Sequence, residues 1–231
     1  MNSPLATPAL FHLGPVPITE AVLVTWGIML LLGIGCSIAT RRLSHNPGRF
    51  QSALELVVEA LDLQIREASG APAQTYRAFI GTLFVYILAA NWMSLVPGVE
   101  PPTAHLETDA ALAALVFVSV IWFGVRANGL GGYLKSFAYP NPVMIPLNIL
   151  ESLTRVFSMF VRLFGNVMSG VFVVGIVASL AGLLVPVPLM ALDLLTGAVQ
   201  AYIFAILALV FITAASAEGG TDHSNAEKGS P

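Results

Sequence analysis

Apolar stretches long enough to cross a membrane alternate with short polar stretches along most of the chain. Residues 21–40, 78–99 and 110–125 contain no charged side chain, and a helix needs about 20 apolar residues to span the hydrocarbon core of a bilayer. Two longer helices are predicted from about residue 146 to 182 and from about residue 189 to 216. Because these two exceed a perpendicular span, we expect them to be tilted or bent.

Residues 50–68 have a different, amphipathic pattern. Charged residues interrupt this stretch too often for a membrane span, but apolar residues recur at helical spacing on one face. We therefore predict a helix that lies on the membrane surface or packs against a partner. The apolar positions are Leu54, Val57, Val58, Leu61 and Ile65, and the charged residues Glu55, Glu59, Asp62 and Arg66 occupy the other faces.

The segments between the predicted helices are rich in glycine, proline and polar residues. Residues 127–147 are predicted as a loop, and Pro186 and Pro188 as a tight turn. We expect an irregular lead-in over residues 1–19 and a disordered tail over residues 218–231. The fold prediction is an all-α integral membrane protein with a single membrane domain. Its helical core, residues 20–217, comprises about five transmembrane helices and one amphipathic surface helix.

Composition supports a membrane protein and excludes a soluble enzyme. Of the 231 residues, 56% are hydrophobic and only 10% are charged, whereas soluble domains carry about 25% charged residues. The single cysteine, Cys36, excludes an internal disulfide and a cysteine-based metal site. The sequence has no nucleotide-binding loop and no metal-binding motif. We therefore expect no cofactor, no metal, no nucleic-acid partner and no ATP hydrolysis by this chain alone.

The basic residues predict how the chain is oriented in the membrane. Of the ten lysines and arginines, five lie between residues 41 and 77, and three more are Arg126, Lys135 and Arg155. Positively charged segments stay on the cytoplasmic side, so we expect the N-terminus outside and the C-terminus in the cytoplasm.

Arg162 is a charge inside an otherwise apolar segment. A guanidinium at the centre of a membrane helix costs about 2.5–3.5 kcal/mol on insertion scales, and it cannot lose its proton to avoid that cost. Ser158, Arg162, Asn166 and Ser169 share one helical face, and Arg155 continues this polar stripe toward the helix start. The pattern favours a functional charge, while a snorkelling or structurally paired arginine remains the alternative.

The last predicted helix carries a matching polar face. Asp193 and Gln200 are seven residues apart and lie on the same side. Because the last two helices are joined by a short turn and pack antiparallel, we expect Gln200 at the depth of Arg162 and Asp193 nearer the outside. Intramembrane ionisable groups usually line ion or proton pathways. A structural salt bridge between Asp193 and Arg162, and an interhelical hydrogen bond of Gln200, remain the alternatives.

The sequence around Arg162 resembles subunit a of the F-type ATP synthase, the membrane stator of the Fo sector. The resemblance covers nearly all of residues 18–217. Its most specific part is Arg162-Leu-Phe-Gly-Asn166, followed downstream by Gln200-Ala-Tyr-Ile-Phe204. Further matching pieces, in the same order, are Thr25-Trp26, Pro47-Gly48, Asn91, Pro97-Gly98, Pro101-Pro102-Thr103 and Gly132-Tyr133.

The resemblance implies a protein that couples ion flow to the rotation of a c-ring, held in place by subunit b and the peripheral stalk. In that family two offset half-channels reach the ring from opposite sides, and the essential arginine, matched by Arg162, lies between them. A ring carboxylate that faces Arg162 is stabilised as the anion and releases its ion. Facing lipid, the same carboxylate must bind a proton or cation to avoid the cost of an unpaired charge.

The resemblance also assigns roles to the other polar residues. Asn166, Gln200 and Ser158 would position the arginine and hold water, Asp193 would relay ions in the outer half-channel, and Glu151 and Arg155 would line the inner exit. Two positions depart from the family pattern. Val171 stands where many relatives carry an acid, and His105 stands where relatives often have aspartate. The transported ion is expected to be a proton, with sodium as the alternative.

Two other functions remain open at this stage. One is a secondary transporter that binds a small anion at Arg162, although the matching halves typical of such transporters are not visible. The other is a membrane scaffold that conducts no ions. The resemblance and the short chain favour a bacterial inner (plasma) membrane as the location.

Overall fold

The computed structural model describes residues 11–13, 16–41, 48–70, 72–96, 99–138, 142–181 and 185–217. These residues form six α-helices, a two-stranded hairpin and four short 3-10 turns. The helices are α1 (Glu20–Thr40), α2 (Arg49–Ser69), α3 (Arg77–Trp92), α4 (Leu106–Ala138), α5 (Ile145–Ala181) and α6 (Pro186–Ala217). The strands are β1 (Phe11–Leu13) and β2 (Val16–Ile18), and the turns are η1 (Ala73–Thr75), η2 (Met93–Leu95), η3 (Pro102–Ala104) and η4 (Pro142–Met144).

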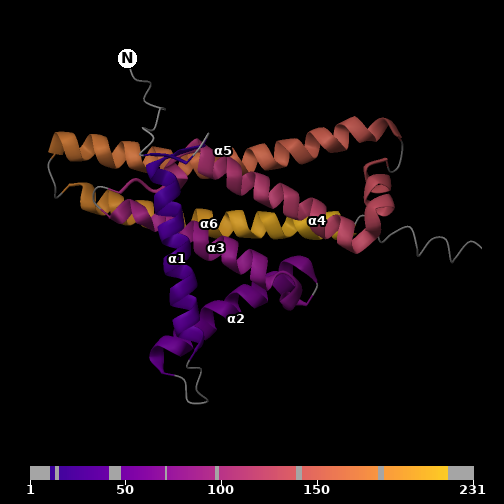
Figure 1. Cartoon of the computed structure of the whole chain (residues 1–231), viewed down its shortest axis with the longest axis horizontal. Coiled ribbons are helices and arrows are strands. Elements are labelled where there is room, and N and C mark those ends of the chain that lie inside the picture. Colours follow the sequence, from indigo (N-terminus) through magenta and orange to yellow (C-terminus); the bar gives the residue numbers. More distant parts are fainter. Residues whose placement is uncertain are drawn as a thin grey trace, which may run out of the picture.

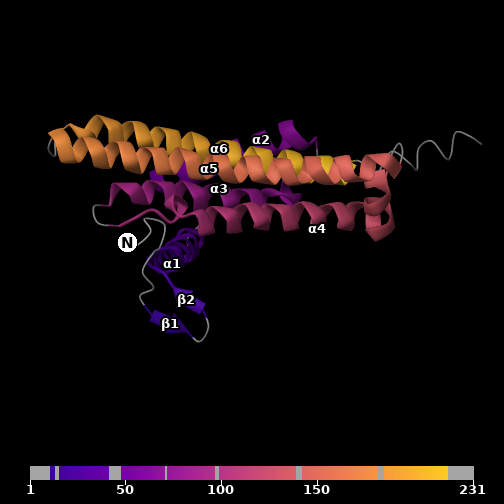
Figure 2. The ribbon, with the colours of Figure 1, turned by 90° about the horizontal axis from the view of Figure 1, so that it is seen from above.

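Five of these helices, all except α2, are long and apolar enough to cross a membrane. This confirms the predicted number of spans, and the last two helices are long, with 37 residues in α5 and 32 in α6. Figure 1 shows α5 and α6 running side by side along the long axis, with α1 crossing the other helices at a steep angle. In Figure 2 the pair α5 and α6 forms one layer, α3 and α4 form the next, and α1 lies beyond them.

The amphipathic helix α2 forms where the sequence predicted it, and it packs against the bundle of its own chain. Ile65, on its apolar face, is fully buried. Asp62, expected on a polar face, is buried as well and forms an ion pair with Arg77 at the start of α3. The Tyr202 hydroxyl of α6 donates a hydrogen bond of 2.6 Å to Gln64 Oε1. These polar contacts fix α2 against α3 and α6.

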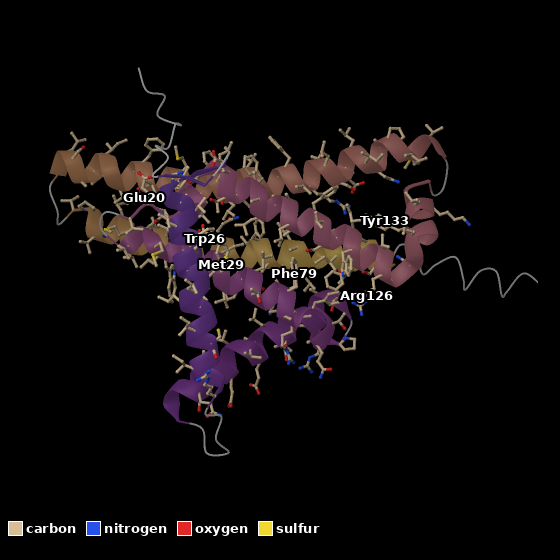
Figure 3. All side chains as sticks on the ribbon, viewed as in Figure 1. Glu20, Trp26, Met29, Phe79, Arg126 and Tyr133 are labelled. Carbon is tan, nitrogen blue, oxygen red and sulfur yellow. The ribbon has the colours of Figure 1, made fainter. Side chains whose placement is uncertain are left out.

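The core is built around α6, which contacts α2, α3, α4 and α5. Small residues on α6 let the neighbouring helices approach closely, which is how helices associate in a membrane, where lipid is as apolar as leucine. The fully buried residues that meet there are Ile80, Ile87, Met159, Leu163, Ala201, Phe204, Ala208, Leu209 and Ile212. By contrast, α1 leaves most of its apolar surface exposed, including Trp26 and Met29, which Figure 3 labels.

The prediction for the third span was wrong at both ends. The span was expected to cover residues 110–125, but α4 runs from Leu106 to Ala138. At its start, Glu107 and Asp109 lie in the first turn, where acidic residues favour the helix dipole. At its end, the glycine-rich segment predicted as a loop is helical, and only Gly129 leaves the helical conformation, at φ 71° and ψ 163°. Glycine adopts this positive φ without steric cost.

The chain differs from the prediction at two further places. The lead-in contains an antiparallel hairpin, with Phe11 opposite Ile18 and Leu13 opposite Val16. Helix α6 begins at Pro186, because proline is tolerated in the first turn of a helix, where its missing N–H has no partner to lose. The predicted disordered tail, residues 218–231, and the first ten residues lie outside the described residues.

The bend of α4 at Gly129 generates a stability prediction. Beyond the bend, Tyr133 packs back on Gly124, where a Cβ atom would lie 2.7 and 2.8 Å from the tyrosine ring; Figure 3 labels Tyr133 in this region. We expect Gly124→Ala to destabilise the protein by about 1–3 kcal/mol through overpacking. Thermal unfolding of the detergent-solubilised protein measures the change.

The matched control is Gly131→Ala, because a Cβ at Gly131 meets nothing within 4 Å. Alanine there should be neutral or stabilising, by up to about 1 kcal/mol from helix propensity. Equal melting temperatures for the two variants would contradict the packing of Tyr133 on Gly124.

Candidate functional site

Arg162 lies on the face of α5 that borders a cavity. The cavity has a volume of about 490 Å³, and α6 contributes Leu207 and Phe211 to its wall. Among the described residues, the Arg162 guanidinium has no hydrogen-bond or ion-pair partner. Of the predicted polar stripe, Arg155, Ser158 and Arg162 line this cavity, whose wall also includes Glu151 and Thr154.

The second arginine of the cavity, Arg155, has partners within the chain. Its guanidinium forms an ion pair with Glu151, one turn earlier on α5, and it lies 5.4 Å from the centre of the Phe211 ring. Both contacts stabilise a cation, the second through the negative face of the aromatic ring. The two arginines therefore differ: one is paired within the chain, and Arg162 is available to a group from elsewhere.

A second, smaller cavity of about 200 Å³ begins one helical turn beyond Arg162. Asn166 on α5 and Asp193 on α6 face this cavity. The other polar or small residues of its wall are Ser169, Gly170 and Thr196. Arg162 and Asn166, four residues apart, thus belong to different cavities along the same pair of helices.

Asp193 is held by its neighbours on η2 and α5. Ser94 Oγ donates a hydrogen bond of 3.1 Å to Asp193 Oδ2. On the other side, the carboxylate occupies the place that a Cβ atom on Gly170 would take, so a larger residue at 170 would displace it. The alternative salt bridge between Asp193 and Arg162 is not formed in the described part of the chain. No sequence pattern pointed to Ser94, because its position beside Asp193 depends on how η2 packs against α6.

Gln200 lines neither of the two cavities. It is only 6% exposed, and its Nε2 has no hydrogen-bond partner among the described residues. Next to it, Asn91 Nδ2 donates to the Gly197 carbonyl at 2.9 Å, and Thr103 Oγ1 donates to Asn91 Oδ1 at 2.8 Å. This buried chain of hydrogen bonds links η3, α3 and α6.

His105 lines neither cavity and lies beside Glu100. Its Nε2 lies 3.4 Å from Glu100 Oε2, and its side chain is 17% exposed against 70% for Glu100. Val171, on α5, is not part of the wall of either cavity. The two positions that depart from the family pattern therefore lie outside the cavities.

Comparison with known proteins gives a consistent result. A family model described as ATP synthase A chain matches residues 22–213. An ATP synthase subunit a 2 of Bradyrhizobium sp. strain BTAi1 is 52% identical over 214 residues, which is 93% of this chain and 96% of that protein. An ATP synthase subunit a of Albidiferax ferrireducens is 45% identical over 88% of this chain and 89% of its own length. An ATP synthase subunit a 2 of Pelobacter propionicus is 45% identical over 90% of this chain and 92% of its own length.

The hydrogen bonds of Asn91 generate a second stability prediction. We expect Asn91→Ala to destabilise the protein by about 2–4 kcal/mol, because it leaves a buried carbonyl and a buried hydroxyl without partners. The neighbouring Trp92 is 47% exposed, and its indole N–H donates a hydrogen bond of 3.4 Å to the Leu194 carbonyl of α6. Its replacement Trp92→Phe serves as the control and should lower the melting temperature much less. An equal or larger loss for Trp92→Phe would contradict a structural role of the Asn91 network.

Proposed function

Since this chain belongs to the ATP synthase A chain family, we propose that it provides two half-channels and an essential arginine that exchange protons with the carboxylates of a c-ring. Its role is that of a non-catalytic stator subunit of the Fo membrane sector. In the proposed mechanism, Arg162 is the residue at which each ring carboxylate changes its ionisation state.

The observation that carries this proposal is the unpaired guanidinium of Arg162. Of the two arginines at the larger cavity, Arg155 forms an ion pair with Glu151 and lies over the Phe211 ring, whereas Arg162 is exposed. A permanent charge in an apolar segment needs a partner of opposite charge, and a carboxylate on the neighbouring ring would supply it. The anionic form of that carboxylate is favoured opposite Arg162, so its proton leaves there.

The two cavities support the proposed half-channels. The larger one, with Glu151 and Ser158, lies toward the start of α5, which basic residues predict to be cytoplasmic. The smaller one, with Asn166 and Asp193, lies beyond Arg162. A fixed positive charge between them repels cations, so protons would pass from one side to the other only on the rotating carboxylates.

Asp193 is the proposed relay of the outer half-channel, the part in which Val171 replaces the acid common in relatives. Ser94 holds one carboxylate oxygen, and the missing side chain of Gly170 leaves room for the group. A hydrated carboxyl at this place can take up and pass on a proton. Sodium remains the alternative ion, since the ion-binding carboxylate belongs to the ring.

The partners follow from the proposed role. They are the c-ring, subunit b with the rest of the peripheral stalk, and membrane lipid around α1 and the outer faces of the bundle. The named relatives are bacterial proteins, and the chain has five membrane-capable helices. We therefore assign it to the bacterial inner (plasma) membrane as a multi-pass protein.

The central prediction concerns Arg162. Arg162→Ala should abolish ATP-driven acidification of inverted membrane vesicles while the complex still assembles. No fixed cation then remains to make the ring carboxylates release their protons. Arg162→Lys should also pump poorly, because a buried lysine can lose its proton and arginine cannot. Quenching of a pH-sensitive dye, with and without sodium and an uncoupler, measures pumping and identifies the ion.

The control variant is Arg126→Ala, which removes an exposed arginine of α4 that borders neither cavity. It should pump normally. Normal pumping by Arg162→Ala would refute the stator mechanism and favour a scaffold that conducts no ions. A transporter would purify alone or with copies of itself, whereas a stator subunit copurifies with the ring and the peripheral stalk.

A further prediction concerns the outer cavity. Asp193→Asn and Gly170→Ala should both slow pumping, the first by removing the exchangeable proton and the second by displacing the carboxylate. We expect a reduction on the order of 10- to 100-fold for Asp193→Asn. Gly175→Ala is the matched control, since a Cβ there meets nothing within 4 Å. Wild-type rates in Gly170→Ala would contradict the proposed use of this space by Asp193.

A further inference from the structure

A second acid, Asp109, is buried without a hydrogen-bond partner among the described residues. It lies in the first turn of α4 and is 0% exposed. Neither of its carboxylate oxygens has a hydrogen-bond partner among the described residues. An ionised carboxylate buried in this way is costly, so it must be neutralised or hydrated.

A helix-capping role does not explain Asp109. An acid that caps a helix accepts hydrogen bonds from the free backbone N–H groups of the first turn, and the oxygens of Asp109 accept none from the described residues. Its own backbone N–H donates to the His105 carbonyl at 3.3 Å. The carboxyl group therefore does not cap the start of the helix.

Asp109 shares its unpaired state with two residues of the proposed ion path. Among the described residues, the buried side-chain atoms that lack a hydrogen-bond partner are Asn166 Nδ2, Gln200 Nε2 and the two oxygens of Asp109. Buried polar atoms without protein partners commonly bind water. Of these residues, Asn166 lines the smaller cavity of the proposed path, and we expect water to reach Asp109 in the same way.

The neighbours of Asp109 connect it both to the surface and to the centre of the bundle. Toward the surface, one turn earlier, His105 pairs with the exposed Glu100. Toward the centre, η3 contacts α1, α3, α4 and α5, and its Thr103 donates to Asn91, the residue bound to Gly197 of α6. Tyr86 is another titratable group within electrostatic reach of Asp109, and its hydroxyl donates a hydrogen bond of 3.5 Å to Thr25 Oγ1.

We propose that Asp109 is a second proton-exchanging carboxyl of the outer half-channel. A proton that arrives at the pair of Glu100 and His105 is taken up by the ionised Asp109 carboxylate, and the carboxyl then returns it to a water molecule on the inner side. The group ends each cycle as it began, so the step needs no other reactant. This inference rests on the proposed function and adds a residue to it.

Pumping by inverted vesicles tests the role directly. Asp109→Asn keeps the shape of the side chain but cannot exchange a proton, so pumping should fall on the order of 100-fold. Asp109→Glu should restore most of the rate, which a purely structural role would not predict. Glu107→Gln removes an exposed acid of the same helical turn and should leave the rate unchanged. A wild-type rate in Asp109→Asn, or a rate that depends on sodium alone, would overturn the proposal.

Chemical labelling of the wild-type complex decides the matter even if the variants fail to assemble. A water-soluble carbodiimide with a small amine modifies carboxyls that are protonated and reached by water, and mass spectrometry locates the product. Asp109 should react, whereas Asp62, buried to a similar degree but paired with Arg77, should not. An unreactive Asp109 would overturn the proposal. Normal pumping by Arg162→Ala would instead refute the proposed function, independently of the labelling.

Discussion

A guanidinium that cannot lose its proton and finds no counter-charge among the described residues is the constraint on which this structure depends. Arg162 could be tolerated more cheaply if Asp193 neutralised it, but that carboxylate is held by Ser94 instead. The chain neutralises Arg155 with Glu151 and leaves Arg162 open. In the proposed mechanism this charge is met in turn by each carboxylate of the ring.

The packing of α6 makes this arrangement possible. Its small residues bring α3, α4 and α5 close, and Gly197 allows Asn91 to approach within 3.1 Å of the place a Cβ would take. The same principle operates at Gly170, where an absent side chain makes room for a carboxylate. In both cases the polar contact exists only because a glycine was placed opposite it, so the glycines are as much part of the site as the polar groups.

Charge-free runs and the polar stripe at Arg162 were sufficient to predict α1, α3, α5 and most of α6, because lipid requires uninterrupted apolar helices. The glycine-rich end of α4 was misjudged, since glycine weakens a helix without forbidding it and only Gly129 takes a non-helical conformation. Asp62, Ser94 and Asp109 could not be assigned from sequence. Their surroundings come from other elements of the fold, and composition alone describes them only as polar residues.

Helix α6 is fastened by side-chain hydrogen bonds near its start, middle and end. Asn91 of α3 holds it at Gly197, Gln64 of α2 at Tyr202, and Asn128 of α4 at Ala215, the last by a bond of 3.1 Å. Helix α5 instead meets α6 through apolar packing and the contact of Arg155 with Phe211. A sideways force on Arg162 would therefore pass from α5 into a helix that side-chain hydrogen bonds from three other helices hold at several points along its length.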